Sequence, residues 1–463
     1  TYNKDFGNHH FKVMAGFNQE SSYQETLDTY SYNQAVLDVP AMSSGTGTIK
    51  ATDSYSEYAI RGGFFRVNYN YLDKYLLEVN GRYDGSSKFP KSSRFGFFPS
   101  VSAGWQIAQE RFMNSTRHWL DGLKLRASYG VIGNQNINPY TFTPSMSVNN
   151  KATSWIIDDT YVTSISSLPA LVSQNFTWEK VGTINVGLDV NLFNNRLSGV
   201  FEWYQRNTNG MLAPGVQLPA VVGASAPYQN TADMRTRGWE LSLNWRDQIG
   251  KVGYRIGFNL SDYKSEIIKY DDNAATKLLS SYYPGQTLGE IWGYVVDGYY
   301  TVDDFVDTSS WQLKEGVTSI NGYNVRPGDV KFKNLRDDDT STNVITSGDN
   351  TFDNPGDRKV IGNTTPRYQY GINLGMNYAG FDLNVILQGT GKRDYWISNV
   401  LTFPMNGDNF VPLFEGLSDY WMPKDPDNGD WSAVNPNAKY PRIYGNRPCA
   451  YSHEPCPNAR AQL

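Results

Sequence analysis

The sequence predicts an all-β fold, a transmembrane antiparallel up-and-down β-barrel. Three observations predict it: apolar side chains recur at every second position of long segments, short and long connections alternate between those segments, and the composition favours strands. Hydrophobic residues make up only 39% of the 463 residues, whereas aromatic residues reach 14% and 42 residues are glycine. Aromatic side chains are enriched in strands, so strands are the expected elements.

The segment 75–89, YLLEVNGRYDGSSKF, shows the alternation most clearly. Tyr75, Leu77 and Val79 fall on one side of an extended chain, and Glu78 and Arg82 fall on the other. In a bilayer the apolar face would contact lipid and the polar face would line the lumen. Aromatic residues near strand ends suit the membrane interface. Those expected there are Tyr71, Tyr75, Tyr83, Trp105 and Trp203.

Eleven segments carry this pattern and are expected to be strands. Tight turns join several of them into hairpins, as at Leu72-Asp73-Lys74, Asn194-Asn195 and Ala379-Gly380. The expected strands are residues 8–22, 56–72, 74–87, 95–108, 121–133, 178–193, 196–211, 235–246, 251–266, 365–378 and 381–397.

The connections alternate between a shorter and a longer set. The shorter ones lie at 73, 109–120, 194–195, 247–250 and 379–380. The longer ones lie at 23–55, 134–177, 212–234 and 267–364, with 88–94 the brief member of that set. Outer-membrane barrels have short periplasmic turns and longer extracellular loops, whereas a soluble sandwich has no reason to sort its loops. A soluble barrel that buries the apolar face inward is the alternative.

Charge and hydropathy exclude other classes. The net charge of −5 shows no excess of basic residues that could bind phosphate groups, so no nucleic-acid partner is expected. No apolar run approaches the ~20 residues of a membrane-spanning helix. The chain opens on the polar residues TYNKDFGNHH rather than on a signal peptide. Either the protein is cytoplasmic or the sequence is an interior piece of something larger.

Motifs for catalysis or for bound groups are weak. Four histidines and no G-x-S-x-G motif offer no nucleophile constellation, so we expect neither an enzyme nor a cofactor. Cys449 and Cys456 could form a local disulfide or be incidental, and no zinc spacing surrounds them. Asp337 and Asp339 begin an alternating acidic loop, but glycine is missing at its sharp turn and the bidentate acid is missing at its end. We expect no metal site; these two aspartates are the candidates if a cation binds, and a solvated acidic loop is the alternative.

Five long motifs, in order from about Asn8 to Gly445, carry a family resemblance. They are YLLEVNGRYDGSSKFPKSSRFGFFPSVSAGW, LDGLKLRASYGVIGNQNI, FTWEKVGTINVGLDVNLFNNRLSG, DRKVIGNTTPRYQYGINL and YWMPKDPDNGDWSAVNPNAKYPRIYG. Together they resemble the C-terminal barrel of the SusC/RagA family of TonB-dependent outer-membrane transporters.

The resemblance implies an active transporter in the outer membrane of a Gram-negative cell. It would import oligosaccharides or peptides into the periplasm, be energised by the TonB complex through an N-terminal part, and work with a SusD-like surface lipoprotein. Residues 1–445 would be part of the barrel and 446–463 a divergent tail. Because such plugged barrels have about 22 strands, eleven strands make roughly half, and we expect a fragment that lacks the plug and the last strands.

The connection at 267–364 is the predicted site of recognition. Unstructured loops beyond ~12–15 residues are uncommon in compact domains, so we expect this one to be folded and functional, on the extracellular side. Its aromatic residues could contact substrate or could pack the loop's own small core. The candidates for substrate contact are Trp292, Tyr294, Tyr282, Tyr283 and Tyr299.

Two other functions stay open at this point. One is a soluble β-rich carbohydrate-binding or adhesive module, which the aromatic and asparagine content would suit. The other is an extracellular β-fold hydrolase. A membrane barrel requires detergent for extraction, whereas neither soluble class does.

Overall fold

The computed structural model describes residues 1–36, 38, 41–146, 169–273, 275–278, 282–336, 343–396 and 415–443, with four two-residue strands between 148 and 166. These residues form two compact units. The sheet unit consists of Thr1–Tyr263 and Gly371–Leu387, and the loop unit consists of the described parts of Lys264–Tyr370 and Gln388–Leu463. Each unit is considered by itself below.

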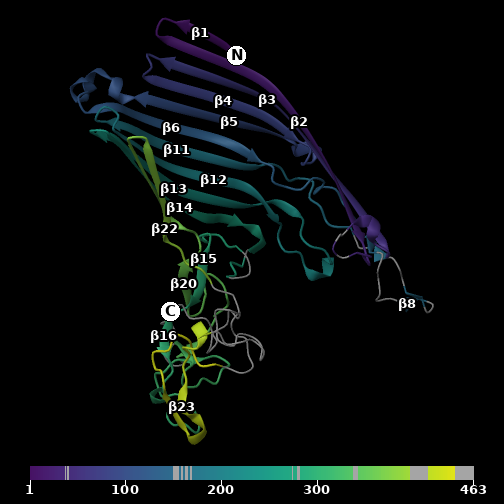
Figure 1. Cartoon of the computed structure of the whole chain (residues 1–463). Helices are drawn as coiled ribbons and strands as arrows, with labels where there is room; N and C mark the ends of the chain where they lie inside the picture. Colours follow the sequence, from purple (N-terminus) through teal and green to yellow (C-terminus); the bar gives the residue numbers. More distant parts are fainter. Residues whose placement is uncertain are drawn as a thin grey trace. The chain divides into compact units, whose positions relative to one another are not determined.

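A single twelve-stranded sheet dominates the chain, and its neighbouring strands follow one another in the sequence (Figure 1). The pairs from β1 to β13 are antiparallel. The strands are β1 (Tyr2–Phe6), β2 (His9–Ser31), β3 (Ile49–Tyr71), β4 (Tyr75–Ser86), β5 (Phe95–Gln106), β6 (Leu120–Asn134), β11 (Glu179–Leu192), β12 (Leu197–Pro214), β13 (Tyr228–Ile249), β14 (Val252–Tyr270), β21 (Arg367–Tyr378) and β22 (Phe381–Lys392).

All eleven expected strands are present, and β1 is a twelfth that the sequence pattern did not predict. β1 turns at Gly7, which has a φ of 61°, and pairs with the first residues of β2. Its five residues carry too short an alternation to be recognised alone. The all-β prediction with sequential up-and-down strands is confirmed.

The short turns adopt the backbone conformation that tight hairpins require. Leu72 and Asp73 have φ values of 56° and 55°. Two successive residues with positive φ match the right-handed twist of the flanking strands. In the turn between β11 and β12 three successive residues, Phe193, Asn194 and Asn195, have φ values of 58°, 57° and 58°. Turns as short as these keep neighbouring strands in register, so the alternating faces continue from strand to strand.

The two faces of the sheet differ in chemistry as predicted. Apolar side chains on one face are exposed, because no described residue of the sheet unit covers them; they include Leu77, Val79, Leu125, Ile184, Val186, Phe201, Trp203 and Leu243. Many side chains on the opposite face are polar and bond across the strands, as the next section describes. A soluble barrel would bury the apolar face, whereas a membrane barrel turns it to lipid. The lipid-facing prediction is therefore supported.

Two strands are much longer than expected. β2 and β3 each span 23 residues. The pattern predicted that β2 ends at residue 22 and that β3 begins at residue 56. Figure 1 shows them continuing past the ends of β4 and β5. Their register is unbroken from His9 opposite Tyr71 to Ser31 opposite Ile49.

A small aromatic core lies in the sheet unit, where long connections meet. Phe89, Phe98, Phe176 and Trp178 are buried together. The Trp178 indole donates a hydrogen bond to the carbonyl of Arg94 at 2.9 Å. These loops are thus fixed to the sheet by side chains from distant parts of the sequence.

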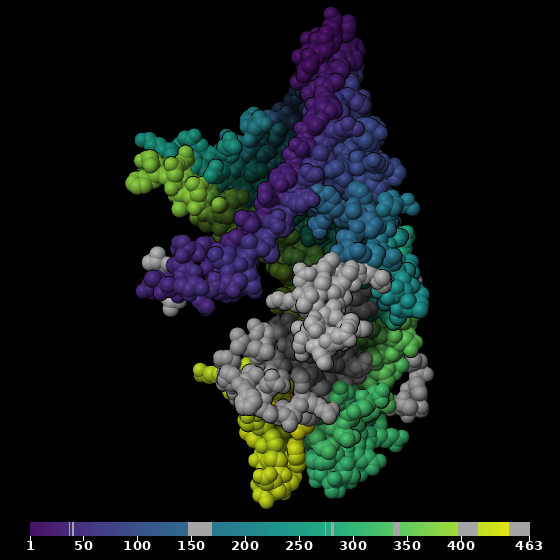
Figure 2. Space-filling model, turned by 90° about the vertical axis from the view of Figure 1, so that its right-hand side faces the viewer, coloured from purple at the N-terminus to yellow at the C-terminus, as the bar shows by residue number. Residues whose placement is uncertain are grey.

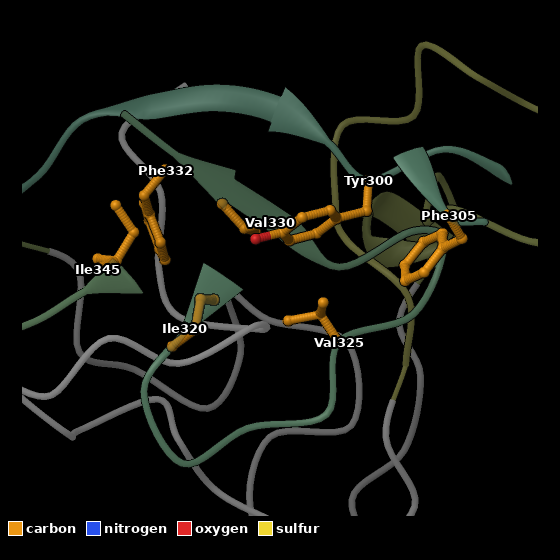
Figure 3. Packing of buried hydrophobic residues seen from close by; sticks show 7 residues of the cluster. All are labelled: Tyr300, Phe305, Ile320, Val325, Val330, Phe332 and Ile345. Atoms are coloured by element: carbon orange, nitrogen blue, oxygen red, sulfur yellow. The ribbon is translucent and has the colours of Figure 1, made fainter. Parts of the chain in front are cut away.

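The loop unit has its own hydrophobic core. Seven buried residues form it, and Figure 3 shows their side chains converging: Tyr300, Phe305, Ile320, Val325, Val330, Phe332 and Ile345. Short elements surround the core, namely β15 (Glu290–Tyr294), β16 (Val296–Tyr299), β17 (Ser319–Ile320), β18 (Val330–Phe332), β19 (Val344–Ile345), β20 (Arg358–Asn363), β23 (Pro423–Asp425) and β24 (Asp430–Ala433). The prediction that the connection at 267–364 is folded is confirmed.

Helices are few and short. Those described are 3-10 turns of three to six residues. Within the described residues, no helix has the length and apolar character needed to cross a membrane.

Candidate functional site

The polar face of the sheet carries a charged ladder that crosses three strands. Arg126 on β6 donates to Asp189 on β11 at 2.9 Å and to Glu202 on β12 at 2.5 Å. Asn185 donates to the other oxygen of Glu202 at 3.2 Å. These residues meet because Arg126 pairs directly with Gly187, and Gly187 pairs with Glu202.

Gly187 allows the Arg126 side chain to lie flat against the sheet. A Cβ atom at this position would lie 2.8 Å from the Arg126 Cζ, closer than carbon atoms normally approach. Glycine in a strand often marks such a close approach. The guanidinium therefore reaches both carboxylates along the wall instead of projecting from it.

A second polar cluster lies between β3 and β4. Arg66 donates to Asn80 at 2.6 Å, and Asn68 and Asn80 donate to Glu78 at 2.5 and 2.8 Å. A hollow of about 670 Å³ on this part of the sheet is lined by residues that include Lys12, Glu78, Lys124 and Arg126. The sheet thus presents a wall of amides and paired charges, which suits contact with water and polar solutes.

The structure places the predicted aromatic residues of the loop unit in three kinds of environment. Tyr283 is buried, and its hydroxyl donates to Glu290. The Trp292 indole donates to the same carboxylate at 2.8 Å and lies 3.0 Å from the Tyr283 hydroxyl. Burial, followed by the bond to Glu290, raises the pKa of Tyr283. This triad fastens the start of β15 to the preceding segment.

Tyr294 and Tyr299 pack against the core of the loop unit and are only partly buried. The ring of Tyr294 lies 5.4 Å from that of Phe332. Burial, with a smaller contribution from the negative charge of Asp419, raises the pKa of Tyr299 to about 12. Each of these residues has one side in the core and another side exposed.

Tyr282 is the most exposed of the five candidates, at 48%. Its ring meets that of Tyr270 edge to face at 5.7 Å. The structure therefore brings Tyr283 and Trp292 together and Tyr294 and Tyr299 around one core, and it leaves Tyr282 outside both groups.

An aromatic pair that the sequence did not single out lies elsewhere in the loop unit. Trp311 and Trp431 meet edge to face with ring centres 5.1 Å apart. Arg326 lies over Trp311 at 5.1 Å, and Arg442 lies over Trp431 at 5.8 Å. Because 120 residues of sequence separate the two tryptophans, nothing in the local pattern could have joined them.

Acidic residues of the loop unit serve its local structure. The Asp304 carboxylate accepts a bond from the Thr301 amide at 2.8 Å and lies 3.2 Å from the Lys331 Nζ. The Asp307 carboxylate caps the turn at Ser309 and Ser310, and hydrogen bonds from this turn lower the pKa of Asp307 to about 2.

Two predicted features lie outside the described residues. They are the candidate cation ligands Asp337 and Asp339, and the cysteines Cys449 and Cys456. Within the part of the chain that the structure describes, no group of three or more histidine, cysteine or acidic side chains could hold a metal ion.

Comparison with known proteins identifies the family of the chain. Residues 1–421 match the family model described as TonB dependent receptor-like, beta-barrel. The TonB-dependent receptor P3 of Formosa agariphila is 29% identical over 410 residues, which cover 84% of this chain and 38% of the relative. The TonB-dependent receptor SusC of Bacteroides thetaiotaomicron is 32% identical over 276 residues, which cover 58% of this chain and 26% of the relative.

A solved structure shares the fold. The RagAB peptide importer in its closed-closed state superposes with a TM-score of 0.70 at 21% identity, over 96% of this chain and 46% of that one. The chain spans about two fifths of the length of the first curated relatives, 38% and 39%. The chain belongs to the TonB-dependent receptor β-barrel family.

Proposed function

We propose that the protein takes part in active import across the outer membrane of a Gram-negative bacterium, energised by the TonB complex. The observation that supports this most strongly is the two-faced sheet. Its apolar side is exposed along the strands, while its polar side carries the Arg126 ladder and the cluster around Glu78. A wall with this distribution separates lipid from a polar passage. The protein is proposed to move solute without transforming it.

We further propose that the solute is an oligosaccharide or a peptide that a SusD-like surface lipoprotein helps to capture. The solved structure that shares the fold is a peptide importer, which suits the peptide class. The oligosaccharide class rests on the resemblance of the five long motifs to the SusC/RagA family. Partly exposed aromatic rings can stack on the C–H faces of sugars or on apolar peptide side chains. In the loop unit these rings belong to Tyr282, Trp292, Tyr294, Tyr299, Trp311 and Trp431.

The loop unit is the proposed place of recognition. Its core and its salt bridges give it a defined surface. Sites on a rigid support hold their contacting groups better than mobile loops do. Tyr283 would act through Trp292, because its own side chain is buried and bonded to Glu290. The partly exposed rings are the ones proposed to touch solute.

Growth and uptake in the source bacterium test this function. Genes beside the receptor gene that encode glycoside hydrolases or peptidases would name the solute class to supply. A deletion of the receptor gene should then abolish growth on that solute and leave growth on its monomer unchanged.

A second variant tests the place of recognition. Removal of residues from about 272 to 356 should abolish uptake or association with the lipoprotein, while the barrel still assembles in the membrane. Normal growth together with normal lipoprotein co-purification would place recognition elsewhere.

A further inference from the structure

The long ribbon formed by β2 and β3 has an outer part that pairs with no other described strand. β4 pairs with β3 only from Ile60 to Tyr71, and β1 pairs with β2 only from His9 to Val13. Residues 20–31 of β2 and 49–59 of β3 therefore continue as a two-stranded ribbon. At ~3.3 Å per residue this part is about 35 Å long. Figure 2 shows its violet tip standing clear of the other strands of the sheet unit.

One face of this ribbon alternates acids with large apolar side chains. Its three central cross-strand pairs are Tyr23 with Glu57, Glu25 with Tyr55, and Leu27 with Asp53. By the period of two, this face continues the apolar outer face of the sheet. Tyr23, Leu27 and Tyr55 are 65%, 66% and 68% exposed. Within the described residues, no cation lies in ion-pair distance of the three carboxylates.

The opposite face of the ribbon is different. At its centre Gln24 pairs with Ser56 and Thr26 pairs with Ser54, and Ser22 pairs with Tyr58. Its acids, Glu20 and Asp28, share the face with Lys50. Tyr58 on this face bonds to Glu20 at 3.3 Å and lies under Lys88 at 4.7 Å. The acid and apolar alternation is thus confined to one face.

An exposed apolar patch rimmed by polar groups marks an interaction site. The carboxylates exclude hydrocarbon as the surrounding medium. They also disfavour an anionic lipid headgroup surface, and they disfavour a second copy of this chain, whose net charge is −5. A basic protein surface with apolar gaps between its cations is the complementary partner.

We propose that this acidic face, made by Tyr23, Glu25, Leu27, Asp53, Tyr55 and Glu57, is a docking surface for a basic patch of the SusD-like lipoprotein. The inference rests on the pairing with that lipoprotein given under Proposed function. Lysine or arginine side chains of the lipoprotein would reach Glu25, Asp53 and Glu57, and its apolar side chains would cover the rings of Tyr23 and Tyr55. Opposite charge would steer the two proteins together and fix their register.

The test compares two double variants that carry the same change of charge on the same ribbon. Glu25→Lys with Glu57→Lys alters the acidic face, and Glu20→Lys with Asp28→Lys alters the opposite face. Each variant is expressed with an affinity tag from its own gene in the source bacterium. The amount of SusD-like lipoprotein that co-purifies is measured at low and at high salt, and heat-modifiable migration of the barrel checks assembly.

The acidic-face variant should lose about tenfold or more of the co-purifying lipoprotein at low salt, and the opposite-face variant should stay within about twofold of wild type. Wild-type association should weaken as salt rises, since salt screens exposed charges. Tyr23→Ser with Tyr55→Ser should also weaken association, and the remaining association should keep its salt dependence because the three carboxylates are unchanged.

Equal co-purification in wild type and the acidic-face variant would overturn this inference and leave the pairing intact. Equal losses in both double variants would overturn it as well, because the total charge of the ribbon, and not contact with the acidic face, would then control association. If the wild type itself imports solute but never co-purifies the lipoprotein, the pairing fails, and this inference fails with it.

Discussion

The guanidinium of Arg442 lies against the carboxylate of Asp329, with Nη2 3.2 Å from Oδ1. Asp329 is fully buried, and its other oxygen accepts a hydrogen bond from the Arg326 amide at 2.7 Å. The Arg442 amide also donates to the carbonyl of Gly328 at 2.9 Å. The segment 415–443 is thereby joined to the connection between β14 and β21, two stretches that are far apart in sequence.

Removal of the guanidinium alone should open this part of the loop unit. Arg442→Met removes the guanidinium that lies 3.2 Å from the buried Asp329 carboxylate, and breaking a buried ion pair typically costs about 3–5 kcal/mol. Asp329→Asn combined with Arg442→Met should cost less, because no buried charge remains. Hydrogen exchange of residues 319–332 in the purified protein measures the opening free energy. Exchange in the single variant as slow as in wild type would show that the pair does not join the two segments.

The two faces of the sheet should respond differently to arginine. Leu77→Arg and Leu188→Arg place a cation on the lipid face and should each cost about 2–4 kcal/mol near the middle of the membrane. Asn80→Arg and Asn185→Arg lie on the polar face and should cost much less. Refolding equilibria of the purified protein in lipid measure the four changes. Equal costs on both faces would contradict the lipid-facing assignment.

Alkali should unfold the loop unit through Tyr300, which is buried, and Tyr299, which is partly buried. Burial raises the pKa of Tyr299 to about 12 and also raises that of Tyr300. The unfolded chain ionises near pH 10, so the contribution of these groups to stability is complete below pH 10. It is lost as the pH rises toward 12.

Tyrosinate absorbance during an alkaline titration measures this effect. A late-ionising fraction should appear together with loss of the loop unit's fold, and Tyr299→Phe should reduce that fraction. If all tyrosines ionise near pH 10 while the unit stays folded, the two rings are not buried as described.

The strands within the membrane-type sheet could be predicted because their alternation is strong and their turns have a local signature. Residues such as Asn194 and Asn195 tolerate positive φ, and they stand where the pattern breaks. The outer part of β2 and β3 could not be predicted, since neither face there is apolar enough to give a period of two. The mutual backbone bonds of the two strands, rather than a buried face, define the ribbon.

The site could be predicted only as a region. The length of the connection at 267–364 and its aromatic content indicated a folded element, and the structure confirms that it is folded. Which rings are buried depends on contacts between distant residues, such as Tyr283 with Phe352 and Trp311 with Trp431. No local pattern encodes these contacts, so burial of Tyr283 and exposure of Tyr282 could not be told apart from the sequence.

Energy coupling tests the central claim most directly. Uptake of the labelled solute by the source bacterium should stop when the TonB gene is deleted, and it should stop when a protonophore collapses the proton gradient. The reason is that a receptor of this family is proposed to open only when the TonB complex acts on it. Receptor abundance in the outer membrane, measured in parallel, should stay unchanged. Uptake that persists under both treatments would mean passive diffusion through an open channel and would contradict the account.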